Sequence, residues 1–144
     1  MRWRVLAALF LAAAEVAAAE FRSVAEGAVT YDAPSLKANK LFILQRDYPV
    51  EVVVAVEGWA KVRDASGTLA WVERKALADK RTVLVRVDRA EVRDAPSESA
   101  PVAFHVARDV VLEFVEYAAV GGWIKVAHRD GQSGFLRASQ VWGG

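Results

Sequence analysis

The sequence predicts an all-β protein built from two tandem, small antiparallel barrels. The main observation is an internal repeat, because residues 57–77 are written again as residues 121–141. Trp59 and Gly67 recur there as Trp123 and Gly131, each 64 positions later. A register kept over such a length indicates one folding unit used twice. The second observation is that both copies consist of short apolar runs interrupted by Gly, Pro and Asp, which is typical of strands and turns.

The first copy carries its strand signals in a clear order. We expect strands at 28–31, 40–44, 50–56, 59–63 and 69–73, with a single 3₁₀-like turn at 74–77. In residues 50–56, Val50, Val52, Val54 and Val56 fall on one face and Glu51 on the other, the period-two pattern of a half-buried antiparallel strand. The turn Asp32-Ala33-Pro34-Ser35 ends the first strand, since Pro fixes φ and Asp can bond back to the backbone.

The second copy repeats this plan and lies close behind the first. Its offset is 62 up to the valine-rich strand and 64 after it, so two extra residues fall in the loop 118–122. Asp130-Gly131 predicts a hairpin with a type I′ turn. Residues 79–81 lead directly into a strand expected at 82–87, with no Gly/Ser linker. We therefore predict that the two modules are held in a fixed relation.

The start of the chain has the pattern of a signal peptide. Arg2 and Arg4 precede an apolar run of ten residues, 5–14, and Ala17-Ala18-Ala19 offers small residues for cleavage before Glu20. Ten residues are too few to span a bilayer as a helix. An uncleaved anchor or a buried helix is the alternative, favoured by Glu15. The predicted organisation is a signal peptide at 1–19, module 1 at 20–80 and module 2 at 81–144, in an exported protein of the periplasm or cell envelope.

Composition excludes several classes of function. After removal of residues 1–19 the chain would carry 17 basic and 17 acidic residues, so it lacks the positive surface that usually attracts nucleic acid. The sequence contains no cysteine, so it predicts neither disulfides nor a thiolate metal site nor a thiol nucleophile. No membrane span is expected after cleavage of the leader.

The repeated motifs resemble those of a known family. Gly-Trp-x-Lys-Val stands at 58–62 and again at 122–126, and Gly-x-x-Gly-Phe follows at 131–135, where the first copy has Ala70 in place of the second glycine. This pattern resembles the bacterial Src homology 3 (SH3) domains, above all their exported tandem members. The resemblance implies two SH3-like barrels of about five strands each. Such relatives commonly act as targeting modules for cell-wall peptides, often beside an amidase or peptidase domain.

The sequence offers no candidate active site. His105 and His128 fall in different contexts, one in an expected strand and one beside a turn, and no third ligand or catalytic partner is spaced to join them. The carboxylates are scattered over turns and outward strand positions. We therefore expect no catalytic residues, no metal and no cofactor, and we interpret the protein as non-enzymatic.

The aromatic residues divide into two groups. We interpret Trp59, Trp123 and Phe135 as structural, packed in the core or at the barrel rim, because modules of about 60 residues are marginal and need their rings buried. Tyr31 and Trp71 differ from their counterparts Arg93 and Phe135. Together with Asp32 and Pro34, they are the candidate ligand-binding residues, an aromatic shelf for an extended peptide. The alternative is that these rings only cover the end of the barrel.

Two functions remain open from the sequence. The first is an envelope protein whose modules bind an extended peptide, from the cell wall or from a protein, by an aromatic shelf and main-chain hydrogen bonds. The alternative is a structural or adaptor protein that holds another envelope protein through a strand edge or the face between the modules. The oligomeric state is not predicted.

Overall fold

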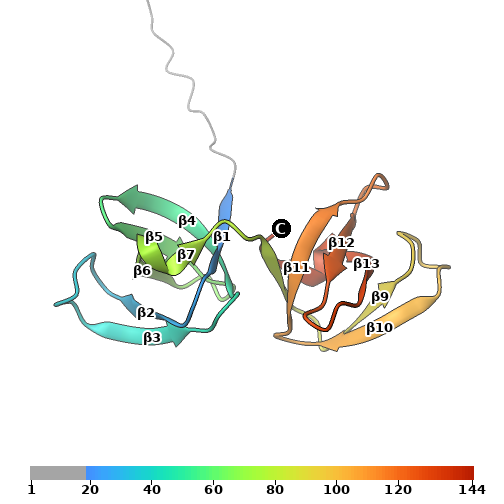
Figure 1. Cartoon of the computed structure of the whole chain (residues 1–144), viewed down its shortest axis with the longest axis horizontal. Coiled ribbons are helices and arrows are strands. Elements are labelled where there is room, and N and C mark those ends of the chain that lie inside the picture. Colours follow the sequence, from blue (N-terminus) through green and yellow to red (C-terminus); the bar gives the residue numbers. More distant parts are fainter. Residues whose placement is uncertain (1–18) are drawn as a thin grey trace, which may run out of the picture.

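The computed structural model describes residues 19–144, and this part of the chain consists of strands joined by turns and two 3₁₀ segments, as predicted. The signal peptide predicted at 1–19 lies, apart from Ala19, outside the described residues. Figure 1 shows two small barrels side by side with the connecting segment between them. No helix in residues 19–144 is long and apolar enough to cross a membrane.

Each module contains seven strands and one 3₁₀ segment. Module 1 comprises β1 (Glu20–Val24), β2 (Ala28–Tyr31), β3 (Lys40–Leu44), β4 (Pro49–Val56), β5 (Trp59–Arg63), β6 (Leu69–Glu73), η1 (Arg74–Ala76) and β7 (Leu77–Ala78). Module 2 comprises β8 (Thr82–Val85), β9 (Arg89–Arg93), β10 (Val102–Ala107), β11 (Val111–Tyr117), β12 (Trp123–Ala127), β13 (Ser133–Arg137), η2 (Ala138–Gln140) and β14 (Val141–Trp142). The resemblance implied about five strands, and β1 and the two-residue β7, with their counterparts β8 and β14, make up the difference.

Both modules have the same antiparallel topology, which confirms the duplication. The strand orders are β3-β2-β6-β5-β4-β1-β7 and β10-β9-β13-β12-β11-β8-β14. In each module one long strand, β4 or β11, pairs with the first strand through its beginning and with the following hairpin through the rest. A bulge interrupts that second pairing in both modules, between Val52 and Val54 and between Phe114 and Glu116. Bulges bend a strand, and this bend folds each sheet into a barrel.

The bulge also limits the valine pattern of β4. Val50 is fully buried, whereas Val54 and Val56 are 43% and 40% exposed. The extra residue at the bulge ends the strict alternation, and the distal half of the strand extends beyond the core. The predicted half-buried strand is therefore right for its first half and wrong for its second.

Each barrel encloses its own apolar core. The buried cluster of module 1 contains Val24, Ala28, Leu44, Val50, Ala60, Val62 and Val72. The cluster of module 2 contains Val83, Val85, Ala90, Val92, Val106, Leu112, Ile124, Val126 and Leu136. Most are β-branched residues from alternate strand positions, which suit a small, strongly twisted sheet. The two cores share no residue, so each module has an apolar core of its own.

The hairpin turns differ from the prediction in type. In both copies the glycine, Gly67 or Gly131, has a positive φ, of 89° and 94° respectively. Asp130 does not, since Asp47 and Asp109 are the positive-φ residues other than glycine in the described chain. The Gly131 amide donates to the carbonyl of His128 at 2.9 Å. This is a type I turn followed by a left-handed glycine, and the predicted type I′ turn is wrong.

The junction between the modules is built from specific contacts. The guanidinium of Arg81 lies between two rings, 5.6 Å from the centroid of Phe21 in module 1 and 5.1 Å from that of Phe114 in module 2. The ring of Phe21 also meets that of Trp142 edge-on at 5.3 Å. A Cβ on Gly143 would lie 2.8 Å from the Cβ of Pro49, so the C-terminal residues pack tightly against module 1. These contacts support the predicted fixed relation of the two barrels.

Candidate functional site

Three aromatic residues of module 1 lie on one outer face of its sheet. We define the aromatic face as Tyr31, Trp59 and Trp71, with the charged Lys61 and Glu73 among them. Tyr31 stands opposite Trp71 in the pairing of β2 with β6, and Trp59 stands opposite Glu73 in the pairing of β5 with β6. Directly paired residues project to the same side of an antiparallel sheet, so all five side chains share this face. Their strand neighbours Ala60, Ala70 and Val72 point into the core and are buried.

Tyr31 is covered on this face. Its ring meets that of Trp59 edge-on at 5.3 Å, and the residue is only 6% exposed. Trp59 and Trp71 are half-buried. The structure therefore brings the predicted pair Tyr31 and Trp71 together, but the open shelf expected from Tyr31 is absent, because the indole of Trp59 lies against it.

Asp32 and Pro34 contribute to the turn after β2. The two carboxylate oxygens of Asp32 accept hydrogen bonds from the main-chain and side-chain nitrogens of Asn39, each at 3.0 Å. Pro34 is exposed in the same loop. The hydrogen bonds of Asp32 fix the loop, which gives that residue a structural role. A groove of about 590 Å³ runs beside the aromatic face, lined by Gly27, Val29, Tyr31, Glu73 and Lys75 among others.

Module 2 presents a different chemistry on the equivalent face. Arg93 takes the place of Tyr31, and Arg137 takes the place of Glu73. Trp123 is 6% exposed, and the guanidinium of Arg137 stacks over its ring at 4.9 Å. Phe135 is half-buried, with the ammonium of Lys125 6.0 Å from its ring centroid. Trp59, Trp123 and Phe135 thus pack on the outer sheet faces and belong to neither core cluster.

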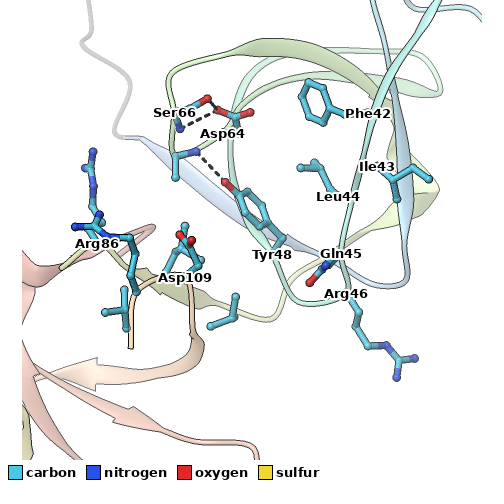
Figure 2. Close-up of a pocket in the computed structure, with 15 residues that line it drawn as sticks. Phe42, Ile43, Leu44, Gln45, Arg46, Tyr48, Asp64, Ser66, Arg86 and Asp109 are labelled. Carbon is cyan, nitrogen blue, oxygen red and sulfur yellow. Dashed lines mark hydrogen bonds between the residues drawn. The ribbon is translucent and has the colours of Figure 1, made fainter. Parts of the chain in front are cut away.

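A cleft lies between the two modules. It has a volume of about 550 Å³, and residues 42–46 at the end of β3 form one wall. Tyr48 and the hairpin residues 64–66 complete the module 1 side, while residues 84–86, Arg108, Asp109 and Val111 form the opposite side. Figure 2 shows Phe42, Leu44 and Tyr48 on the module 1 side, with Arg86 and Asp109 across from them on module 2.

The wall formed by β3 is the edge of a sheet. The order of strands in module 1 begins with β3, so one side of its backbone has no neighbouring strand. Ile43 is 69% exposed, although it is a large apolar residue. On the side of β3 that faces β2, the hydroxyl of Thr30 accepts a hydrogen bond from the Phe42 amide at 3.1 Å and donates one to the Phe42 carbonyl at 3.0 Å. This bridges the bulge between β2 and β3 and holds the edge strand in place.

The polar part of the cleft centres on Tyr48. The Ala65 amide donates a hydrogen bond of 3.2 Å to its phenolic oxygen (Figure 2). Burial raises the pKa of Tyr48 above its ordinary value of 10.0, the Ala65 hydrogen bond opposes this shift, and the negative charges of Asp64 and Asp109 reinforce it. Asp64 is itself held in its turn, where it accepts hydrogen bonds from the amides of Ser66 and Thr68 at 2.9 and 3.0 Å.

Comparison with known proteins identifies the family. The family model described as "Bacterial SH3 domain" matches the chain twice, over residues 24–79 and 86–143. The chain belongs to the bacterial SH3 domain family. The two matches fall within the two barrels, so each module is one SH3 domain. No curated protein matches the chain.

Several solved structures are similar to the tandem SH3 chain. NlpC2 from Trichomonas vaginalis has 17% sequence identity, with a TM-score of 0.40 over 86% of this chain and 48% of its own. NlpC1 from the same organism has 16% identity and a TM-score of 0.41 over 96% and 50%. An NlpC/P60 family protein from Bacillus cereus ATCC 10987 has 18% identity and a TM-score of 0.39 over 85% and 55%. The chain spans about half the length of these structures.

The histidines of the SH3 chain take part in local pairs. Nδ1 of His128 lies 3.1 Å from the Asp130 carboxylate, and Nε2 of His105 lies 3.8 Å from that of Glu91. A hydrogen bond from the Gln132 amide lowers the pKa of Asp130, and His128 adds to the shift. Within residues 19–144 no group of three or more His, Cys, Asp or Glu side chains is arranged to hold a metal ion.

Sequence reasoning named the face between the modules as a possible surface of an adaptor, but it did not predict the cleft there or the residues that line it. Its lining comes from segments that are distant in the sequence and belong to different copies of the repeat. The short connection at 79–81 was the available signal, because it predicts two barrels in contact. The residues that face each other across that contact are set by the docking of the barrels, which no local pattern encodes.

Proposed function

We propose that this protein is a non-enzymatic binding protein of the cell envelope, which holds an extended peptide in the cleft between its SH3 modules. The observation that carries this proposal is the position of β3. β3 is the edge strand of its sheet, and its residues 42–44 line the cleft together with residues 45 and 46 of the following turn. A peptide could add there as a further strand, through main-chain hydrogen bonds.

The shape and chemistry of the cleft support an extended peptide. Phe42, Ile43, Leu84 and Val111 provide apolar contact, and Ile43 is free to meet a ligand side chain. Three cationic side chains, Arg46, Arg86 and Arg108, lie around the same cleft as the anionic Asp64 and Asp109. Mixed charges of this kind suit a peptide that carries both carboxylate and amino groups.

Assignment to the envelope and to binding rests on the family and on the leader predicted at 1–19. The absence of cysteine from the sequence is consistent with a binding role, because it removes the thiol nucleophile that a papain-like hydrolase requires. A cell-wall peptide is the first candidate ligand. The adaptor function remains the second candidate, because Leu36, Leu41 and Ile43, 64%, 47% and 69% exposed, give the β3 side of module 1 an apolar surface suited to a protein partner.

Sedimentation of the purified protein with isolated peptidoglycan tests the proposal. We expect the wild type to sediment and Ile43→Lys to bind at least about tenfold more weakly, because a charge would stand at the centre of the wall. Val120→Lys is the matched control, since Val120 is 52% exposed and lies outside the cleft. Both variants should keep the stability of the wild type.

Hydrogen exchange gives a second measurement. Amides of β3 should become protected on binding, whereas those of β10, the equivalent edge in module 2, should not. Equal binding by Ile43→Lys and wild type would contradict the cleft as the site. A wild type that does not sediment but co-purifies with an envelope protein would support the adaptor function.

A further inference from the structure

The outer face of module 2 carries a second groove, separate from the cleft. We define the arginine groove as Arg89, Arg93 and Arg137 with Glu91, Glu98 and Trp123, which line a volume of about 430 Å³. It shares no lining residue with the cleft between the modules. The side chains come from β9, β12, β13 and the loop between β9 and β10.

The repeat shows that this chemistry is confined to one module. The positions equivalent to Arg89, Arg93 and Arg137 are Gly27, Tyr31 and Glu73 in module 1. Three guanidinium groups thus stand where the first module has one carboxylate and no cation. Both modules keep the same strands and a tryptophan at this face, so the fold does not require the arginines.

Two of the three arginines, Arg93 and Arg137, are held in position by their surroundings. The Arg137 guanidinium stacks on the indole of Trp123, 4.9 Å from the ring centroid. The Arg93 Nη1 donates a hydrogen bond of 2.8 Å to the Ala100 carbonyl. A guanidinium fixed in this way loses little conformational freedom when it binds an anion. Arg89 is exposed and makes none of the ion pairs found in residues 19–144.

A carboxylate already occupies part of the groove. Glu98, in the loop after β9, pairs with Arg137 although 39 positions separate them in the sequence. The Glu98 side chain is 72% exposed and belongs to a surface loop. Little besides its ion pair with Arg137 therefore holds it in the groove. Glu91 pairs in the same way with Arg93. Two glutamates against three arginines leave one positive charge without an internal partner.

We propose that the arginine groove binds a carboxylate of an acidic peptide, and that Glu98 occupies the position of that carboxylate when no ligand is present. Guanidinium groups can pair with carboxylates through two parallel hydrogen bonds. Arg137 already donates one hydrogen bond of this kind, from Nη2 to the Oε1 atom of Glu98. When a ligand carboxylate displaces Glu98, it meets the guanidinium groups of Arg137 and of the unpaired Arg89. Glu91 lies beside the site and would repel a phosphate dianion, which makes a phosphorylated ligand the less favourable partner.

Titration of the full protein with a tetraglutamate peptide, blocked at both ends, tests this site through the fluorescence of the tryptophans. We expect saturable binding of tetraglutamate and none of blocked tetraglutamine or of inorganic phosphate. Arg89→Gln and Arg137→Gln should each weaken binding about tenfold, because a charge-assisted hydrogen bond is lost. Glu73→Gln, at the position of Arg137 in module 1, is the matched control and should have no effect.

The role of Glu98 as a competitor is tested by a separate variant. Glu98→Gln should tighten the binding of tetraglutamate about fivefold, because it removes a tethered competitor. Glu116→Gln changes the charge of module 2 by the same amount at an exposed position outside the groove, and it should change affinity less than twofold. Equal effects of these two variants, binding of tetraglutamine, preference for phosphate, or unchanged affinity in both arginine variants would each overturn the proposal. None of these results depends on the cleft, so the two proposals can fail separately.

Discussion

The hydroxyl of Thr82 donates a hydrogen bond of 2.6 Å to the main-chain oxygen of Asp47. Thr82 begins the first strand of module 2, and Asp47 lies in the turn between β3 and β4 of module 1. Asp47 has a φ of 66°, as does its counterpart Asp109 with 69°, so this turn is a shared feature of the repeat. The Asp47 carboxylate also lies 3.7 Å from the Lys80 ammonium and 3.6 Å from the Arg129 guanidinium. The duplicated turn of one module has thus become a docking point for the other.

Thr82→Val should destabilise the protein by about 1 to 2 kcal/mol, because the variant has nearly the same shape but leaves the Asp47 carbonyl without its donor. Thr82 is only 2% exposed, so water would not readily replace the hydroxyl. Urea denaturation measures the change. Thr68→Val is the control, since the Thr68 hydroxyl is exposed and contacts Ser66; it should stay within about 0.5 kcal/mol of the wild type.

Arg81→Met should loosen the junction. Methionine keeps the length of the side chain but removes the cation between the rings of Phe21 and Phe114 and the 3.3 Å hydrogen bond to the Gly143 carbonyl. We expect a loss of about 1 to 2 kcal/mol in unfolding free energy and a larger radius of gyration by small-angle scattering. Arg74→Met, the same substitution at an exposed position in η1, should change neither. An unchanged scattering profile for Arg81→Met would show that the other contacts are sufficient to fix the modules.

Much of the fold could be predicted because its signals are local. The Gly-Trp-x-Lys-Val segments, the hairpin glycines and the alternating valines each specify a strand or a turn within a few residues, and the repeat doubles every signal. The failures involve non-local structure. Val54 and Val56 follow the strand pattern, but a bulge determined by the pairing of β4 with β5 places them outside the core.

The candidate site was less predictable for the same reason. The difference between Tyr31 and Arg93 correctly marked the face on which the two modules diverge. Whether the ring of Tyr31 is open, however, depends on Trp59, a residue 28 positions away that packs against it. A cleft lined by Ile43 and Asp109 requires the docked pair of barrels, so it has no signal in either repeat.

Tyr31→Ala should destabilise the protein by about 3 kcal/mol or more, because it removes a buried ring and leaves the edge of Trp59 without its partner. Trp71→Ala, at the half-buried position opposite, should cost about 1 to 2 kcal/mol. Thermal unfolding measures both. A Tyr31→Ala variant within about 1 kcal/mol of the wild type would restore the interpretation of Tyr31 as a ligand-binding residue rather than a structural one.

Tyr48→Phe should alter how stability depends on alkaline pH. Burial raises the pKa of the Tyr48 phenol in the folded protein, so above the ordinary pKa of 10.0 the unfolded chain loses this proton first. The stability of the wild type therefore falls as the pH rises from 10 through the folded pKa, and the phenylalanine variant lacks this contribution.

At pH 7 the same variant should be less stable by about 1 kcal/mol, because the Ala65 amide loses its 3.2 Å hydrogen bond to the phenolic oxygen. Denaturation measured at several pH values between 8 and about 11.5 should therefore give unfolding free energies that converge for the two proteins, because the wild type loses its advantage. Ionisation of lysines and of the other tyrosines affects both proteins equally and cancels in the difference. A constant difference in unfolding free energy across this range would mean that Tyr48 ionises as readily in the folded protein as in the unfolded chain. The cleft would then be open to water at the Tyr48 hydroxyl.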